Sequence, residues 1–188
     1  MRLDHFSNAA FDRGASRPKE VIWLIANGLL ISSWLPGSGW RSALLRAFGA
    51  RIGKGVVIKP GVRVKFPWRL VVGDHVWIGE DVWIDNLDQV SIGAHSCLSQ
   101  GAYLCTGSHD WTDPQFGLVT KPIRIAGECW VGARSVLAPG TTMERGAVLA
   151  MGGLGRGLLD AGMIHVGVGG VAAKPRRGYA ASTDVEIR

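Results

Sequence analysis

One histidine stands where a regular sequence pattern breaks, and its residue type suits proton transfer. His109 lies in the run GSHDWTDPQFGLVTKP, residues 107–122, which is rich in turn-forming residues. Histidine changes charge near neutral pH, so it can act as a general base that takes a proton from a hydroxyl or an amine during acyl transfer. A loop histidine bonded to a backbone carbonyl is the alternative, and position alone leaves both open.

The cysteines and the other histidines indicate no second chemistry. Cys97, Cys105 and Cys129 lie inside or beside the repeat described next, and none of them forms a CxxC pair. They are typical of reduced packing residues in a cytoplasmic protein. The histidines near them do not have the spacing of metal ligands. We therefore expect no metal.

A period of six residues organises the part of the chain that must position His109. Aliphatic residues recur every sixth place, and the residue four places further on is small or β-branched. Three blocks carry the pattern: Val72, Ile78 and Ile84; Ile92, Leu98 and Leu104; and Ile125, Val131, Leu137, Met143 and Leu149. This period fits neither a helix nor an ordinary strand, and it predicts a parallel β-helix whose aliphatic side chains point into a triangular prism. Between Ile52 and Leu154 we expect about five coils, with one long loop at 107–122.

Composition supports a single folded domain with added terminal segments. The chain has 188 residues, of which 47% are hydrophobic and 19% charged, which excludes wholesale disorder. The net charge of +6 is spread over the repeats and the tail, and no nucleic-acid-binding motif is present. We expect an N-terminal helical segment at 1–50, the β-helix at 51–155 and an irregular C-terminal tail at 156–188.

The N-terminal segment contains the most apolar stretch of the chain. Residues 21–35, VIWLIANGLLISSWL, are fewer than the roughly 20 apolar residues that cross a bilayer. We expect a helix that packs on the β-helix or on a neighbouring subunit, with a peripheral membrane contact at the inner membrane face as the alternative. A second short helix is predicted at 41–48, ending at Gly49. Outward tryptophans at 77, 83 and 130 favour a trimer in which prism packs on prism.

With the hexads, the stretches VVGDHVWIGEDVWIDN (71–86) and YLCTGSHDWTDPQF (103–116) resemble the hexapeptide-repeat O-acetyltransferases. The resemblance covers roughly residues 20–150. The chain is similar to the branch that contains the maltose, galactoside and nodulation acetyltransferases. Within this branch it most resembles the colanic acid biosynthesis acetyltransferases. The resemblance implies a left-handed β-helix, a homotrimer with the donor cleft between subunits, acetyl-CoA as the acyl donor, and a sugar hydroxyl of an exopolysaccharide intermediate as the acceptor.

The resemblance also implies roles for individual residues. His109 matches the catalytic base, and Asp85 and Asn86 lie where relatives contact the acceptor, although a corner turn would explain this polar pair equally well. Trp130, Ala133 and Met151 match positions beside the donor, although Trp130 also suits intersubunit packing and Met151 the core. After Thr141 the chain departs from the family pattern, and the Thr-Lys pair expected near the donor phosphates falls at Arg156 and Gly157. Arg156, Lys174 and Arg176 are the cations that would replace it.

Three other functions remain open at this stage. An amine acceptor, in an amino sugar or an antibiotic, would use the same base and the same donor. A non-catalytic β-helix scaffold is favoured by the divergent tail and disfavoured by His109, Asn86 and Trp130. A carbonic-anhydrase-like metal enzyme on this fold would need three converging histidines, and the spacing of His75, His95 and His109 does not match that family.

Overall fold

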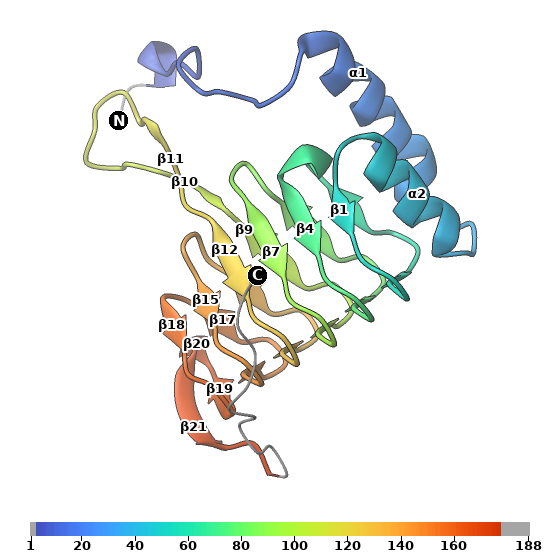
Figure 1. Ribbon diagram of the computed structural model, residues 1–188. Helices are drawn as coiled ribbons and strands as arrows, with labels where there is room; N and C mark the ends of the chain where they lie inside the picture. The colour runs from blue at the N-terminus through green and yellow to red at the C-terminus, as the bar shows by residue number, and fades with distance from the viewer. Residues whose placement is uncertain (1–2, 178–188) are drawn as a thin grey trace.

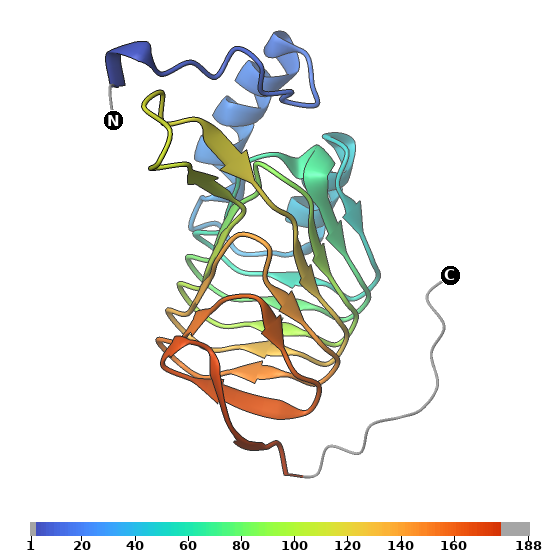
Figure 2. The same ribbon diagram turned by 90° about the vertical axis from the view of Figure 1, so that its left-hand side faces the viewer.

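The computed structural model describes residues 3–177, most of which form the left-handed parallel β-helix expected from the sequence (Figures 1 and 2). Three sheets, called A, B and C here, make the three faces of the prism, and the chain visits them in that order in every coil. Sheet A contains β1 (Arg51–Ile52), β4 (Leu70–Val72), β7 (Val90–Ile92), β12 (Ile123–Ile125), β15 (Thr142–Met143) and β18 (Leu158–Leu159). Sheet B contains β2 (Val57–Ile58), β5 (Trp77–Ile78), β8 (Cys97–Leu98), β13 (Trp130–Val131), β16 (Val148–Leu149), β19 (Met163–Val166) and β21 (Val171–Pro175). Sheet C contains β3 (Arg63–Val64), β6 (Trp83–Asp85), β9 (Tyr103–Cys105), β14 (Val136–Leu137), β17 (Leu154–Gly155) and β20 (Val168–Gly169).

The six-residue period places one aliphatic side chain per face into the interior. Successive coils are in register, so that Ile58 pairs with Ile78 and Ile78 with Leu98 in sheet B. All the aliphatic residues of the three blocks are buried. The core is therefore a stack of equivalent positions, which is why the sequence period alone located it.

The edges of the prism require backbone turns in the left-handed region. At the edge between sheets A and B, Gly55, His75 and His95 have φ of 63°, 55° and 59°. Side chains other than glycine rarely adopt this conformation. A Cβ on Gly55 would lie 2.4 Å from Nδ1 of His75, so the first coil also needs the smaller residue there.

Two helices close the first end of the prism, as Figure 1 shows. The first, α1 (Arg17–Ala26), continues into the π-helical turn η2 (Asn27–Ile31), and α2 (Gly39–Ala47) follows. Trp23, Ile31 and Leu45 are buried in the same core as the first coil, and Nε1 of Trp23 donates to the carbonyl of Val64 at 3.0 Å. Within residues 3–177 no helix is long and apolar enough to span a membrane.

The coil continues past the expected five turns. Strands β18, β19 and β20 form a sixth turn inside the segment expected to be an irregular tail, and β21 pairs antiparallel with β19 at the far end. The repeat is hidden there because the inward positions change type: His165 replaces the aliphatic residue below Leu149, and Gly169 follows Gly155. Residues 178–188 of the tail lie outside the described residues.

The remaining elements lie at the edge between sheets C and A. They are the short 3-10 helix η3 (Pro67–Arg69) and the hairpin of β10 (Gly107–His109) and β11 (Leu118–Thr120), while a further 3-10 turn, η1 (Leu3–His5), begins the described chain. Figure 2 shows the hairpin projecting from the prism beneath the N-terminal segment. The interrupted repeat at 107–122 is therefore an antiparallel hairpin carried by the third coil.

Candidate active site

The hairpin holds the imidazole of His109 in one orientation. Strands β10 and β11 pair antiparallel, with His109 opposite Leu118. Nδ1 of His109 lies 2.8 Å from the carbonyl oxygen of Phe116, and the two rings are stacked with their centroids 4.2 Å apart. Phe6, from the N-terminal segment, meets the same imidazole edge-on at 5.4 Å. The side chain is thus fixed between two aromatic rings and remains half-buried.

The carbonyl contact decides which nitrogen of neutral His109 carries the hydrogen. A carbonyl oxygen only accepts hydrogen bonds, so Nδ1 must donate and the neutral ring has its lone pair on Nε2. A bond to a backbone carbonyl and a role as general base are therefore compatible in His109. The backbone-bonded nitrogen is Nδ1, and Nε2 is left as the nitrogen able to accept a proton.

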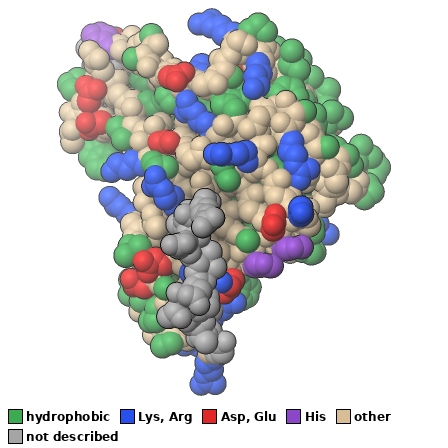
Figure 3. Space-filling view, viewed as in Figure 1, with side chains coloured by type: hydrophobic (Ala, Val, Ile, Leu, Met, Phe, Trp, Pro, Cys, Tyr) green, Lys and Arg blue, Asp and Glu red, His purple; other side chains and the backbone are tan. Residues whose placement is uncertain are grey.

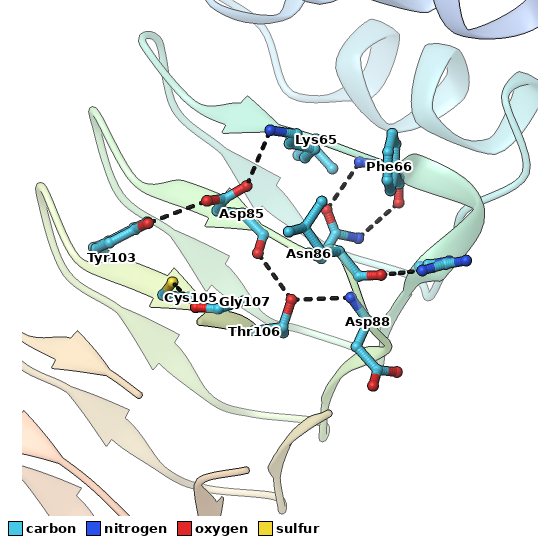
Figure 4. Close-up of polar contacts among 12 residues, drawn as sticks. Lys65, Phe66, Asp85, Asn86, Asp88, Tyr103, Cys105, Thr106 and Gly107 are labelled. Atoms are coloured by element: carbon cyan, nitrogen blue, oxygen red, sulfur yellow. Dashed lines mark hydrogen bonds and ion pairs between the residues drawn. The ribbon is translucent and has the colours of Figure 1, made fainter. Parts of the chain in front are cut away.

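A polar cluster lies on the outer face of sheet C, one coil before His109 (Figure 4). Lys65, Asp85 and Cys105 follow one another along this face, since β3 pairs with β6 and Asp85 with Cys105. The hydroxyl of Tyr103 donates to Oδ2 of Asp85 at 3.1 Å, and Nζ of Lys65 lies 3.7 Å from Oδ1. Burial, with Cys105 and Asp85 nearby, raises the pKa of Tyr103, which keeps its hydroxyl protonated as a donor. Tyr103 and Lys65 thereby hold the carboxylate of Asp85 in place on the outer face of the prism.

Asn86, the neighbour of Asp85, has a structural position. Its side chain is fully buried, Oδ1 accepts from the backbone N–H of Phe66 at 2.9 Å, and Nδ2 donates to the carbonyl of Phe66 at 2.6 Å. In the next coil, Thr106 occupies a similar place and donates from Oγ1 to the carbonyl of Asp85 at 3.0 Å. The corner-turn alternative therefore describes Asn86, and Asp85 is the member of the pair that faces outward.

The residues expected beside the donor lie on a different edge of the same chain. Trp130 lies on the outer face of sheet B, is 49% exposed, and donates from Nε1 to the hydroxyl of Ser99 at 2.8 Å. Ala133 and Met151 follow at the edge between sheets B and C in successive coils, and Met151 is 79% exposed. Met151 is therefore a surface residue, not a core residue.

The three expected cations lie in three different places. Arg156 directly follows β17 at the edge between sheets C and A, the edge from which the His109 hairpin leaves two coils earlier. Lys174 is exposed on β21. Nη1 of Arg176 donates to the carbonyls of Glu128 and Gly146, at 2.8 and 3.2 Å, at the edge between sheets A and B. Only Arg156 shares the edge of His109.

The cysteines are placed for packing. All three are free thiols. Burial raises the pKa of the Cys129 thiol to about 11 and also raises the pKa of Cys97, so both stay protonated near neutral pH. No group of three or more potential metal ligands occurs among the described residues.

Four contact residues of the site were not predicted from the sequence. Lys65 and Tyr103 follow from the sheet register, which the six-residue period contains: they stand one coil away from Asp85 on the same face. Phe6 and Phe116 have no such signal, because they reach His109 from an irregular segment and from a hairpin loop.

Comparison with known proteins finds similarity to acetyltransferases. No protein-family model matches the chain. The chain is 42% identical over 149 residues to the colanic acid biosynthesis acetyltransferase WcaF of Escherichia coli K12, which covers 78% of this chain and 81% of that protein. A hexapeptide-repeat acetyltransferase of Vibrio cholerae O1 biovar eltor, solved in complex with acetyl-CoA, has a TM-score of 0.72 at 22% identity over 87% of this chain and 88% of that one. A maltose O-acetyltransferase of Clostridium difficile 630 has a TM-score of 0.67 at 20% identity over 80% and 82%. The two structures establish likeness of fold.

Proposed function

The chain belongs to the acetyltransferase family that contains the colanic acid biosynthesis enzyme WcaF, and from this premise we propose that it transfers an acetyl group from acetyl-CoA to a sugar hydroxyl. The observation that carries the proposal is the fixed tautomer of His109, with Nδ1 bound to the carbonyl of Phe116 and Nε2 able to accept a proton. Membership alone supports acyl transfer. The choice of a hydroxyl, the donor and the role of His109 are our proposal.

In the proposed mechanism His109 removes the proton of the acceptor hydroxyl. As the O–H bond breaks, the proton moves to Nε2 and the oxygen forms a bond to the acetyl carbonyl carbon. The Phe116 carbonyl stabilises the imidazolium through Nδ1–H, so the ring keeps its orientation while it is charged. The C–S bond of the donor then breaks, and the thiolate takes the proton from Nε2. Asp85, one coil away, and the hydroxyl oxygen of Tyr103, in the coil that carries the hairpin, offer acceptors for the other hydroxyls of the sugar.

The donor supplies an activated thioester, and its other end carries phosphates. One arginine of this chain is placed to bind them. Arg156 is exposed and lies on the edge of His109, and it has no ion-pair partner within residues 3–177. A guanidinium suits phosphate oxygens because its N–H groups bind them in pairs. Lys174 stays a candidate, whereas Arg176 already donates to two backbone carbonyls.

We further propose that the complete site lies between two copies of the chain. In one copy Trp130, Ala133 and Met151 lie on sheet B and its edge with sheet C, whereas His109 and Arg156 lie on the edge between C and A. A cyclic trimer of triangular prisms brings two different edges of neighbouring copies together. Trp77 and Trp130, exposed by 44% and 49% on sheet B, suit such an interface.

The proposal is tested by replacing His109. We expect His109→Ala to lower kcat by about a hundredfold to ten-thousandfold, the usual contribution of a general base. The binding constant for acetyl-CoA, measured by calorimetry, should stay the same. His95→Ala, at an exposed corner of the prism, is the matched control and should retain wild-type turnover. Full activity of His109→Ala would refute the mechanism, and absence of acetyl-CoA binding by the folded wild-type protein would favour a non-catalytic scaffold.

The acceptor atom is a separate question. An amine would use the same base, and a panel of sugars and amino sugars with mass-spectrometric and alkaline-hydrolysis analysis of the product separates the two. Esters are cleaved by mild base and amides are not. We expect an alkali-labile product.

A further inference from the structure

A pocket of about 300 Å³ lies between α1 and the first two coils, and it shares Lys65 with the polar cluster of the candidate active site. Its walls combine cations with flat aromatic rings, among them Arg13, Arg63, Lys65, Phe66, Trp68 and Trp83. The volume is at the lower end of the range of small-molecule sites.

The charge of the pocket is positive. Arg13 is paired with Glu20 at 2.7 Å, and Lys65 faces Asp85 at 3.7 Å. Arg63 is exposed, and within residues 3–177 it forms no ion pair; its guanidinium lies over the ring of Trp83, 4.7 Å from the centroid. Stacking on the indole limits the positions that the side chain can take, so less entropy is lost when the guanidinium binds an anion. Arg63 is therefore a cation held ready for an anionic group.

The aromatic walls suit a sugar or an apolar chain. Trp83 stacks on Tyr103 with ring centroids 4.6 Å apart, and Phe66 stacks on Trp68 at 5.0 Å. Val21 and Leu24 of α1 also line the pocket, and they are 56% and 70% exposed. The opening of the pocket is thus apolar on the side of α1 and positive on the side of sheet C.

The pocket adjoins the candidate active site through one shared residue. Lys65 lines the pocket and contacts Asp85, whose strand pairs with β9 just before the His109 hairpin. Lys65 and Cys105 are two strand spacings apart, roughly 10 Å. The N-terminal segment joins the same two places, because Phe6 contacts His109 while the carbonyl of Arg13 accepts from Nε1 of Trp68 at 2.8 Å.

We propose that this pocket binds a phosphate ester of the acceptor, the group that links its sugar to an apolar chain, with Arg63 and Lys65 as the phosphate ligands. The proposal rests on the sugar acceptor of the proposed function and names its chemical class, an amphiphilic glycan phosphate. In this arrangement the phosphate lies beside Arg63, the chain leaves along Val21 and Leu24, and the sugar extends over Asp85 and Tyr103 toward His109. Figure 3 shows hydrophobic side chains gathered with Lys and Arg at the end of the molecule that carries α1 and α2.

The experiment measures binding without any acetyl transfer. Quenching of tryptophan fluorescence is followed with three probes below their aggregation concentrations: farnesyl phosphate, farnesol and UDP-glucose. Trp68 and Trp83 line the pocket and report on it. We expect farnesyl phosphate to bind at least tenfold more tightly than farnesol. Arg63→Gln should weaken its binding about tenfold, the size of one charge-assisted hydrogen bond. Arg124→Gln, an exposed arginine on the outer face of sheet A, should leave it unchanged.

Each outcome decides a different part of the proposal. Equal binding of farnesyl phosphate and farnesol, or equal losses in Arg63→Gln and Arg124→Gln, would overturn the phosphate subsite. Binding of UDP-glucose in preference to farnesyl phosphate, with the same dependence on Arg63, would keep the subsite and replace the lipid by a nucleotide. A failed pocket leaves the His109→Ala result untouched, so the two proposals stand or fall separately.

Discussion

At the scale of single residues, the backbone of the site is as informative as its side chains. The carbonyl of Phe116 fixes the tautomer of His109, although Phe116 itself has a φ of 54°, in the region that non-glycine residues rarely adopt. Turns of this kind often persist where a side chain must be aimed. The sequence indicated His109 as a candidate base, but the bond to Phe116 depends on a loop conformation that no periodicity encodes.

Asn86 gives a prediction that separates packing from substrate contact. The amide of Asn86 binds both backbone polar groups of Phe66 inside the protein. Asn86→Ala therefore leaves the buried N–H of Phe66 without a partner, while the Phe66 carbonyl keeps its bond from the N–H of Arg69. We expect the free energy of unfolding, measured with urea, to fall by about 2 kcal/mol. Asp85→Asn is the matched change on the outer face and should cost less than about 1 kcal/mol, since its ion pair with Lys65 is partly exposed. Unchanged stability in Asn86→Ala, together with a raised KM for the sugar, would restore the acceptor role expected from the sequence.

At the scale of elements, the strands followed directly from the sequence and the loops did not. Each coil repeats one pattern, so residues such as Ile78, Leu98 and Val131 could be placed on a common inner column before the structure was known. The sixth coil was not predicted, because His165 and Gly169 stand at positions where the pattern requires aliphatic residues. The pair Asp85 and Asn86 shows the same limit on a smaller scale, since the period places them at an edge without saying which one faces outward.

The helical cap depends on one buried arginine. Arg41 of α2 is fully buried and donates to the carbonyls of Ile31, Ser33, Leu35 and Gly37 at 3.1, 2.6, 2.6 and 2.7 Å. It thereby holds the turn between η2 and α2, whose carbonyls have no strand or helix to bind them. This role could not be predicted from the sequence, because an arginine in an amphipathic helix is usually exposed.

Replacement of Arg41 should loosen the cap and spare the coils. Methionine keeps much of the side-chain volume of arginine but cannot donate to the four carbonyls, so we expect Arg41→Met to increase amide hydrogen exchange at residues 17–40 at least tenfold. Exchange at residues 70–155 should stay as in the wild type, because each coil contacts mainly its neighbours. Arg46→Met is the control from the same helix; Arg46 binds the carbonyls of Ile52 and Gly53 and does not touch the turn. A uniform rise in exchange over the whole chain would show that cap and coils unfold as one unit.

At the scale of the whole molecule, the outer surface suggests how the protein is placed in the cell. α1 and the turn that follows it expose Val21, Ile22, Leu24, Ile25 and Leu29 by 56%, 57%, 70%, 56% and 71%. Arg17 and Lys19 lie at the start of the same helix, and the whole chain carries a net charge of +6. An apolar helix face bordered by cations suits an anionic lipid surface, where apolar side chains enter the interface and the cations meet lipid phosphates. We propose this occupant for the face, in agreement with an amphiphilic acceptor in the adjacent pocket.

Binding to vesicles tests this placement. We expect the protein to sediment with vesicles containing about one-third phosphatidylglycerol. High salt should release it, because the Debye screening length falls to roughly 3 Å at 1 M ionic strength. The double variant Ile22→Glu and Leu29→Glu should abolish sedimentation, because two charges then replace exposed apolar side chains of this face. A second double variant, Trp77→Ser and Trp130→Ser, changes the outer face of sheet B instead. It should still bind vesicles, but its molar mass, measured by light scattering, should fall below that of a trimer. If the helix variant loses the trimer and the sheet B variant does not, then α1 packs on a second copy of the chain, and the membrane contact would have to be abandoned.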